Sequence, residues 1–119
     1  GHSVGNRAIQ LVADAIGRCI RGGDVAARYG GDEFIVLLPQ TDAGASEQAM
    51  RRIRNTVFAT TLKVDGRIVR ISASVGLAVF PHDGGSARQL LSAADEAMYA
   101  DKKRRRGHGR EPQSLRDTG

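Results

Sequence analysis

One short stretch stands out in this sequence, because two glycines followed by two carboxylates lie between apolar runs. It reads Tyr29-Gly30-Gly31-Asp32-Glu33-Phe34. The flanking residues 25–29 and 34–39 are β-prone, and a Gly-Gly junction between such segments favours a β-hairpin. Glycines let a ligand approach the backbone, and their N–H groups can face phosphate oxygens. Asp32 and Glu33 add hard oxygen ligands for a divalent cation, although a solvated turn with two acids has the same pattern.

Three amphipathic helices are predicted around this hairpin. The first covers residues 4–20 and is terminated by residues 21–24, among which Gly22 can adopt a left-handed cap. The second begins after Asp42, a suitable N-cap, and the third follows a capping box formed by Ser86 and Gln89. The apolar stripes are Ile9, Val12, Ile16 and Cys19 in the first helix, Ala45, Ala49, Ile53 and Val57 in the second, and Leu90, Ala94 and Ala97 in the third.

A second hairpin is predicted where Asp65-Gly66, a strong turn signal, separates two β-prone segments. These segments are residues 61–64 and residues 68–80. Residues 75–80 are apolar without interruption, so we expect the end of this long strand to be well buried. The order helix, strand, strand, helix, strand, strand, helix predicts an α+β fold with helices packed on an antiparallel-rich sheet.

Composition and charge limit the classes of function. The 119 residues allow one domain, and 40% apolar with 26% charged residues is typical of a soluble globular protein. No apolar run approaches the roughly 20 residues of a membrane span, and no signal peptide is visible. The single cysteine, Cys19, fits a reduced, cytoplasmic setting. The net charge of +5 comes largely from basic residues 102–106, and the few aromatic residues nearby argue against nucleic-acid binding.

Four separated motifs resemble, in order, those of GGDEF domains, the diguanylate cyclases that condense two GTP molecules into the bacterial second messenger cyclic di-GMP. The resemblance extends from Gly1 to about Arg110. The matching segments are Gly-His-Ser-Val-Gly-Asn at 1–6, Arg-Tyr-Gly-Gly-Asp-Glu-Phe at 28–34, Ser-Ala-Ser-Val-Gly at 72–76, and Ala-Asp-Glu-Ala-Met-Tyr at 94–99 followed by Lys102. Agreement of several motifs in one order makes the resemblance specific.

The resemblance implies a cyclase palm domain, which is ferredoxin-like, with its N-terminal helix and central strand missing from this sequence. It divides the chain into a partial GGDEF domain at 1–110 and a disordered C-terminal tail at 111–119. The chain does not begin with methionine, so we expect a longer parent protein with an upstream sensory or regulatory domain. That parent could be tethered to a membrane. Because the missing strand carries a metal ligand in the family, we expect the fragment alone to be inactive. Because that strand also lies inside the family's sheet, we expect interior strands with unpaired backbone groups, and a fragment that associates, exchanges elements with a partner chain or folds poorly.

The resemblance also assigns roles around the hairpin. Asp32 and Glu33 would be catalytic and would bind Mg²⁺ or Mn²⁺, with Asp32 also accepting the proton of the attacking hydroxyl. The residues that match nucleotide contacts are His2, Asn6, Gly30, Gly31, Lys102 and Arg106. At Asn6 the family usually has Asp, and an amide offers guanine only one acceptor, so the preference for guanine is put in doubt.

Arg21 and Asp24 match the family's Arg-x-x-Asp product-inhibition motif, and Arg52 matches a further arginine of that site. An ordinary loop salt bridge is the alternative for Arg21 and Asp24. The family acts as a homodimer, with one GTP held by each domain. Two functions therefore remain open: a product-inhibited cyclase, or a non-catalytic module that binds cyclic di-GMP through Arg21, Asp24 and Arg52.

Overall fold

The computed structural model describes the backbone of residues 4–108 and the side chains of residues 4–105. His2 and the predicted tail at 111–119 lie outside the described residues, and so does the side chain of Arg106. Along the described chain the elements are α1 (Val4–Cys19), β1 (Val25–Gly30), β2 (Glu33–Pro39), α2 (Ala43–Phe58), β3 (Thr61–Val64), β4 (Arg67–Arg70), β5 (Ser74–Phe80) and α3 (Ala87–His108). This is the α+β fold predicted from the sequence.

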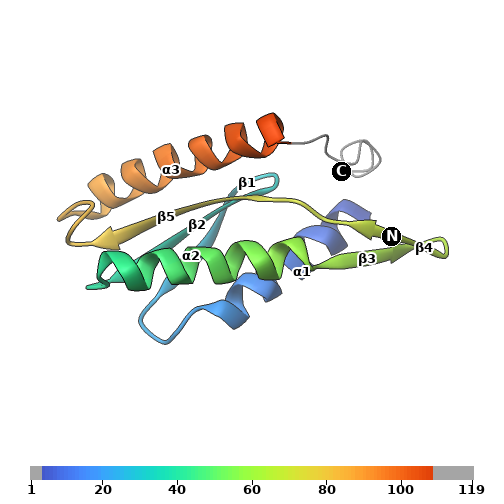
Figure 1. Ribbon diagram of the computed structural model, residues 1–119, viewed down its shortest axis with the longest axis horizontal. Coiled ribbons are helices and arrows are strands. Elements are labelled where there is room, and N and C mark those ends of the chain that lie inside the picture. The colour runs from blue at the N-terminus through green and yellow to red at the C-terminus, as the bar shows by residue number, and fades with distance from the viewer. Residues whose placement is uncertain (1–3, 109–119) are drawn as a thin grey trace.

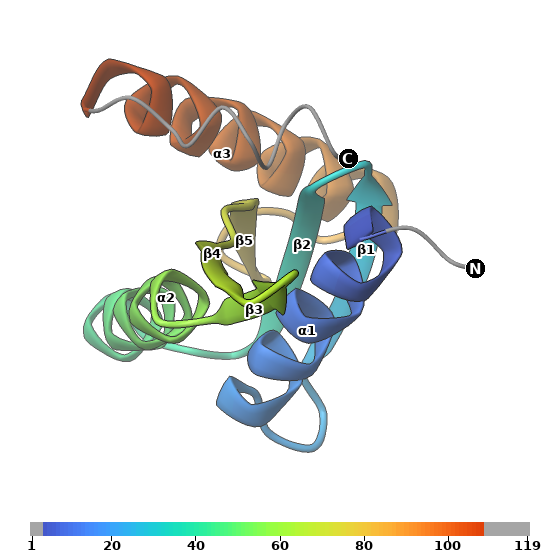
Figure 2. The ribbon, with the colours of Figure 1, turned by 90° about the vertical axis from the view of Figure 1, so that its right-hand side faces the viewer.

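A three-stranded sheet lies between two helical layers. α3 covers one face, and α1 and α2 cover the other (Figures 1 and 2). The strand order is β1-β2-β5, with β1 antiparallel and β5 parallel to β2. A separate antiparallel pair, β3 and β4, projects from the end of the molecule. Two of the three strand pairings are therefore antiparallel.

Alternation along β2 divides the core between the two faces. Phe34, Val36 and Leu38 belong to the cluster that α1 and α2 cover, whereas Ile35 packs with α3. Successive strand residues point to opposite faces, so a strand buried on both sides needs an uninterrupted apolar run. The run Phe-Ile-Val-Leu-Leu at 34–38 meets that requirement.

The parallel pairing of β2 with β5 changes one expectation about this sheet. We expected interior strands to be left with unpaired backbone groups. Instead β2 pairs directly with β5 from Glu33 opposite Ser74 to Pro39 opposite Phe80, and with β1 on its other edge. The central strand of the sheet therefore has both edges covered.

The predicted strand at residues 68–80 is two strands in two different sheets. β4 ends at Arg70, β5 begins at Ser74, and residues 71–73 cross between the sheets. Ile71 and Ala73 are 2% and 6% exposed, so this crossing is packed into the core. An apolar run signals burial and carries no information about where pairing changes partner, which is why the sequence suggested one continuous strand.

The helix caps agree with the sequence in most details. The Asp42 carboxylate accepts a hydrogen bond from the Ala45 N–H at 2.7 Å, as an N-cap should. Ser86 Oγ accepts from the Gln89 N–H at 3.2 Å. Gln89 Oε1, however, accepts from the N–H of Gly85, whereas a capping box would use the N–H of Ser86 itself. The positive φ after α1 belongs to Gly23, at 97°, and the prediction of a left-handed Gly22 was wrong.

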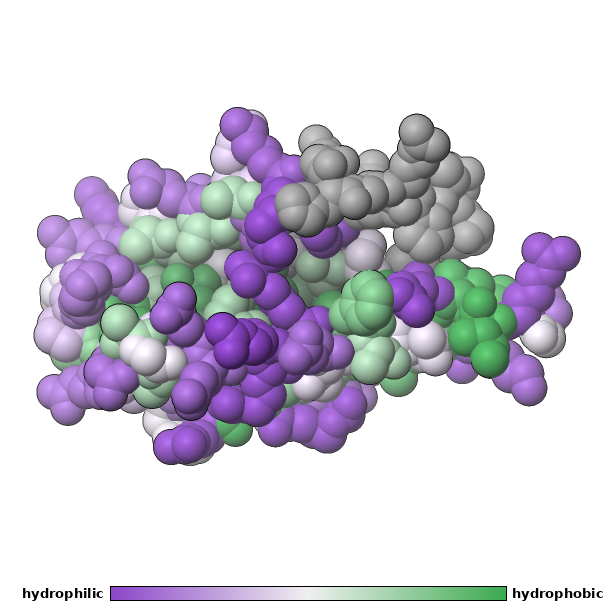
Figure 3. Space-filling model, in the orientation of Figure 1, coloured by the Kyte–Doolittle hydropathy of each residue, from purple (hydrophilic) through white to green (hydrophobic). Residues whose placement is uncertain are grey.

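The surface carries apolar side chains where the β3–β4 pair projects (Figure 3). Ile68 on β4 is 75% exposed, and the guanidinium of Arg70 lies 4.1 Å from the centre of the Phe58 ring.

No helix within residues 4–108 combines the length and apolarity that a membrane crossing requires.

Helix α3 approaches β5 most closely at Gly76. A Cβ built on Gly76 would collide with the Ala94 carbonyl oxygen and would lie 2.6 Å from the Met98 backbone nitrogen. Both obstacles are backbone atoms of one helix, so no side-chain rotation relieves the collision. Glycine at this position therefore sets the distance between α3 and the sheet.

We predict that Gly76→Ala lowers the free energy of unfolding by about 3 kcal/mol, because α3 must move off β5. Gly22→Ala is the matched control, since a Cβ there would meet nothing within 4 Å. It should be neutral or slightly stabilising. Urea unfolding of both variants measures the difference, and equal stabilities would show that α3 adapts without cost.

Candidate functional site

The turn between β1 and β2 is tied down through its backbone. Strand pairing places Gly30 opposite Glu33, so the loop consists of Gly31 and Asp32. Arg28 Nε donates to the carbonyl oxygens of Gly30 at 3.0 Å and Gly31 at 3.2 Å. The Ser74 N–H donates to the Asp32 carbonyl oxygen at 2.9 Å. With three successive carbonyls bonded, the direction of the two acidic side chains is constrained.

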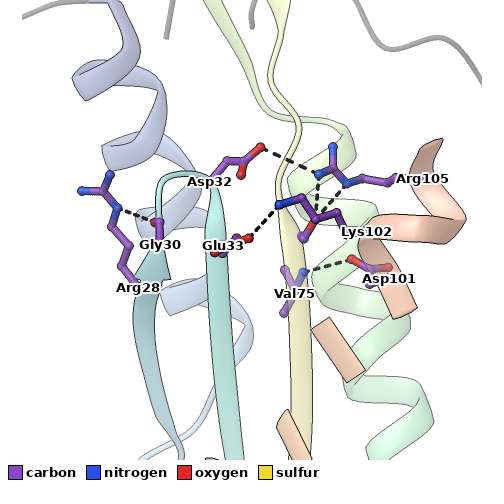
Figure 4. A network of polar contacts seen from close by, with 9 residues as sticks. Arg28, Gly30, Asp32, Glu33, Val75, Asp101, Lys102 and Arg105 are labelled. Carbon is purple, nitrogen blue, oxygen red and sulfur yellow. Dashed lines mark hydrogen bonds and ion pairs between the residues drawn. The ribbon is translucent and has the colours of Figure 1, made fainter. Parts of the chain in front are cut away.

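Both acids of the turn face basic side chains of α3 (Figure 4). Lys102 Nζ lies 2.8 Å from Glu33 Oε2, and these side chains are 26% and 23% exposed. Arg105 Nη2 lies 3.8 Å from Asp32 Oδ2 and also donates to Ser74 Oγ at 2.6 Å. Lys102 and Arg105 are three residues apart and so lie on one side of the helix. The site is thus a set of two opposed ion pairs.

The Gly30 backbone lies against the Glu33 side chain. A Cβ on Gly30 would overlap Glu33 Oε1, whereas one on Gly31 would meet nothing within 4 Å. The Glu33 carboxylate therefore folds back across the Gly30 backbone and toward Lys102. The two glycines of the signature have different surroundings: Gly30 lies against the Glu33 carboxylate, whereas Gly31 leaves the turn open from outside.

Asp101 fixes the end of α3 over the turn. Its side chain is 5% exposed and accepts the Val75 N–H at 2.9 Å. Arg104 Nη2 lies 2.5 Å and Arg54 Nε 3.5 Å from Asp101 Oδ1. Burial and the neighbouring Arg104 charge lower the pKa of Arg54, while Asp101 acts in the opposite direction. This carboxylate joins α3, β5 and α2 immediately before Lys102.

Several of the predicted site residues come together at the turn: Gly30, Gly31, Asp32, Glu33 and Lys102. Asn6 is exposed in the first turn of α1. α1 begins at the same end of the sheet as the hairpin tip (Figures 1 and 2). The roles of these residues stay predictions.

Sequence reasoning missed Arg105, Ser74 and Asp101. The prediction placed Lys102 together with Arg106, whose side chain lies outside the described residues and whose role stays a prediction. Among the described contacts, Lys102 meets Glu33 and Arg105 meets Asp32. A run of basic residues at 102–106 does not reveal which of them faces the sheet. The only available signal was that positions i and i+3 also share a helix face.

The second predicted cluster lies at the other end of α1. The Asp24 carboxylate accepts the Arg21 backbone N–H at 2.8 Å, and Arg52 Nη2 donates to the Cys19 carbonyl oxygen at 3.1 Å. The contact between Arg21 and Asp24 is therefore backbone to carboxylate rather than the loop salt bridge considered as an alternative. Arg21 is exposed, and among the described contacts its guanidinium has no ion-pair partner.

The acids of the turn suit a divalent cation that completes its shell with other oxygens. The carboxylates of Asp32 and Glu33 offer hard oxygen atoms, and the Asp32 side chain is 44% exposed. Mg²⁺ is commonly held by one or two carboxylates together with water and substrate phosphates. Among the described side chains, those of residues 4–105, no group of three or more His, Cys, Asp or Glu is placed to hold a metal. The site thus fits a cation that arrives with a phosphate ligand.

Comparison with known proteins identifies the class to which this fold and site belong. The family model described as "Diguanylate cyclase, GGDEF domain" matches residues 1–108. Diguanylate cyclase A of Treponema denticola is 38% identical over 102 residues, which are 86% of this chain and 28% of that protein. Diguanylate cyclase DosC of Escherichia coli is 36% identical over 107 residues, 89% of this chain and 23% of that protein. The chain belongs to the GGDEF family.

Solved structures agree with this assignment. The GGDEF domain of TpbB (YfiN) from Pseudomonas aeruginosa matches with a TM-score of 0.72 and 30% identity, over 87% of this chain and 61% of that one. The diguanylate cyclase SiaD of the same species, solved with its activator SiaC, matches with a TM-score of 0.66 and 28% identity, over 83% of this chain and 38% of that one. The chain thus spans less than two thirds of the relatives and structures it resembles.

We predict that Asp101→Ala destabilises the domain by about 3 kcal/mol, because it leaves the Val75 N–H and the guanidinium groups of Arg54 and Arg104 without their acceptor. Asp95→Ala, an exposed position on the same helix, should change stability by less than about 0.5 kcal/mol. Thermal and urea unfolding compare the two variants. If they were equally stable, Asp101 would not be what holds α3 over the turn.

Proposed function

We propose that this chain is the catalytic domain of a diguanylate cyclase that condenses two GTP molecules into cyclic di-GMP and releases pyrophosphate. The observation that carries the proposal is the pairing of both signature acids with basic residues of α3 in a chain that belongs to this family. Carboxylates for a cation and cations for phosphate are the groups that phosphoryl transfer requires.

In this proposal the 3′-hydroxyl of one GTP attacks the α-phosphorus of the other. The new phosphodiester bond forms as the bond between the α-phosphorus and the bridging oxygen breaks, and pyrophosphate leaves. A second step of the same kind, in which the two nucleotides exchange roles, closes the ring and releases the second pyrophosphate. Asp32, the more exposed acid at 44%, accepts the hydroxyl proton. Lys102 supplies positive charge for phosphate, and Gly31 leaves room for the nucleotide at the turn.

Asp32 and Glu33 are the residues that would hold Mg²⁺ or Mn²⁺. A bound cation would neutralise the charge that develops on the phosphate oxygens. Because only two carboxylates of the described residues lie at the turn, we expect weak cation binding and little GTP turnover by the 119 residues alone. Incubation of this chain with GTP and magnesium, followed by chromatography of the products, tests that expectation.

Two copies of the domain are needed, because each site holds one nucleotide and the reaction joins two. A homodimer that brings two turns face to face therefore belongs to the proposal. An upstream sensory or regulatory domain would control that encounter, and the reaction would take place in the cytoplasm, where GTP is available. In this proposal the net charge of +5 serves to bind the phosphates of the nucleotide, and nucleic acid is not a partner.

Product inhibition is assigned to the loop after α1. Asp24 is held by the Arg21 N–H, and Arg52 is held at the end of α1 by the Cys19 carbonyl. Arg21 and Arg52 can therefore present guanidinium groups to the phosphates or guanine edges of cyclic di-GMP. The same observation supports a second candidate function, a module that binds cyclic di-GMP without catalysis.

The two candidates differ in the turn. We predict that Asp32→Ala lowers cyclic di-GMP formation by several orders of magnitude in a cyclase-active protein containing this domain, because cation binding and proton acceptance are both lost. Glu96→Ala, at an exposed position of α3, is the control and should keep normal turnover. Near-normal turnover in Asp32→Ala would remove the catalytic assignment and leave the binding module.

A separate prediction concerns Arg21. Arg21→Ala should weaken cyclic di-GMP binding by about 1–3 kcal/mol and leave turnover at low product concentration largely intact. Isothermal titration calorimetry gives the affinity, with Arg18→Ala, exposed in the last turn of α1, as the control for loss of a charge. Unchanged affinity in Arg21→Ala would contradict the inhibitory site.

A further inference from the structure

Arg105 occupies a position at the proposed site that the signature motifs do not assign. Its side chain is 16% exposed although it stands in the basic run at the end of α3. Nε and Nη2 donate to Ser74 Oγ at 3.2 and 2.6 Å, and Nη2 lies 3.8 Å from Asp32 Oδ2. Figure 4 shows the guanidinium reaching from α3 toward the Asp32 carboxylate. Arg105 is thus held beside one of the two acids.

The neighbouring ion pair has the same arrangement. Lys102 Nζ lies 2.8 Å from Glu33 Oε2, so each acid of the turn faces one basic side chain from the same side of α3. A divalent cation on these acids would come close to both basic groups and would be repelled by them. A phosphate chain bound to that cation would place new oxygen acceptors near the same basic groups.

We propose that Arg105 is a counter-ion that exchanges partners: it faces Asp32 when no cation is bound, and it binds a phosphate oxygen when a divalent cation and a polyphosphate enter together. The inference rests on the proposed function, because it needs Asp32 to be a cation ligand. Lys102 makes the corresponding exchange at Glu33. The exchange couples the two ligands, so each one raises the affinity of the site for the other.

The proposal predicts effects of opposite sign for one substitution. In Arg105→Gln the charge that competes with the cation is removed, so Mn²⁺ alone should bind about three- to ten-fold more tightly. The Mn²⁺ complex of inorganic tripolyphosphate should bind about ten-fold more weakly, because a charge-assisted hydrogen bond is lost. A residue that only stabilises the fold would weaken both, and a solvated helix end would change neither.

The experiment uses the 119-residue chain and two binding measurements. The electron paramagnetic resonance signal of free Mn²⁺ gives the affinity for the cation, and calorimetry gives the affinity for the Mn²⁺–tripolyphosphate complex. Lys103→Gln is the matched control, since it removes one positive charge from the adjacent position, where Lys103 is exposed and lies 5.2 Å from the centre of the Tyr99 ring. It should shift both affinities by less than about two-fold through long-range charge alone.

Asp32→Asn separates the outcomes. If Mn²⁺ binding to the unmodified chain does not depend on Asp32, both the proposed cation site and the exchange are wrong. If it does depend on Asp32 but Arg105→Gln behaves as Lys103→Gln does, or weakens both ligands, only the exchange is wrong. If Arg105→Gln folds poorly, a measurement on the unsubstituted chain still tests the exchange. The nuclear magnetic resonance signal of the Arg105 Nε–H should shift when Mg²⁺ is added and shift again with Mg²⁺–tripolyphosphate. A resonance unmoved by both would overturn the exchange.

Discussion

The contact on which the site depends is the close approach of α3 to β5. Gly76 lets the backbone of α3 lie directly on the strand near Ala94 and Met98. Further along the helix the buried Asp101 carboxylate accepts the Val75 N–H. These two contacts, about one to two turns of helix apart, fix both the distance and the rotation of α3. A helix held in this way presents a defined face at its C-terminal end.

That face determines the electrostatics of the turn. Lys102 follows Asp101 directly and meets Glu33, and Arg105 follows one turn later and meets Asp32. The acids need this arrangement too, because two adjacent carboxylates on a short turn repel each other unless cations offset their charge. Arg104 and Arg54 on Asp101 keep that buried carboxylate paired. The same few residues therefore stabilise the contact between α3 and β5 and position the basic side chains opposite the two acids.

Local signals in the sequence predicted local structure well. The hairpin around residues 30–33, the N-cap at Asp42 and the turn at Asp65-Gly66 all depend on residues within a few positions of one another. One local detail, the left-handed cap predicted at Gly22, was wrong. The larger features that the sequence did not predict concern choices made by distant segments. The break at residues 71–73 depends on β5 leaving β4 to pair with β2. Which basic residue faces Asp32 depends on the rotation of α3, which Gly76 and Asp101 set through tertiary contacts that periodicity does not record.

The outer edge of β5 is an edge of the sheet that no strand of the described chain covers. Near each end of β5, a backbone N–H on this edge is bound by a carboxylate. The Val75 N–H is bound by Asp101, and the Val79 N–H is bound by Asp83 at 2.7 Å. The second bond and the adjacent His82 lower the pKa of Asp83. Because the pKa of Asp83 is lowered in the folded state, the stability it contributes is present above its ordinary value near 4 and is lost as the pH falls through the lowered pKa. An edge whose N–H groups are bound by carboxylates resists pairing with another strand. A further strand added beside β5 would first have to displace Asp101, which is the residue that aligns Lys102 and Arg105 on the turn.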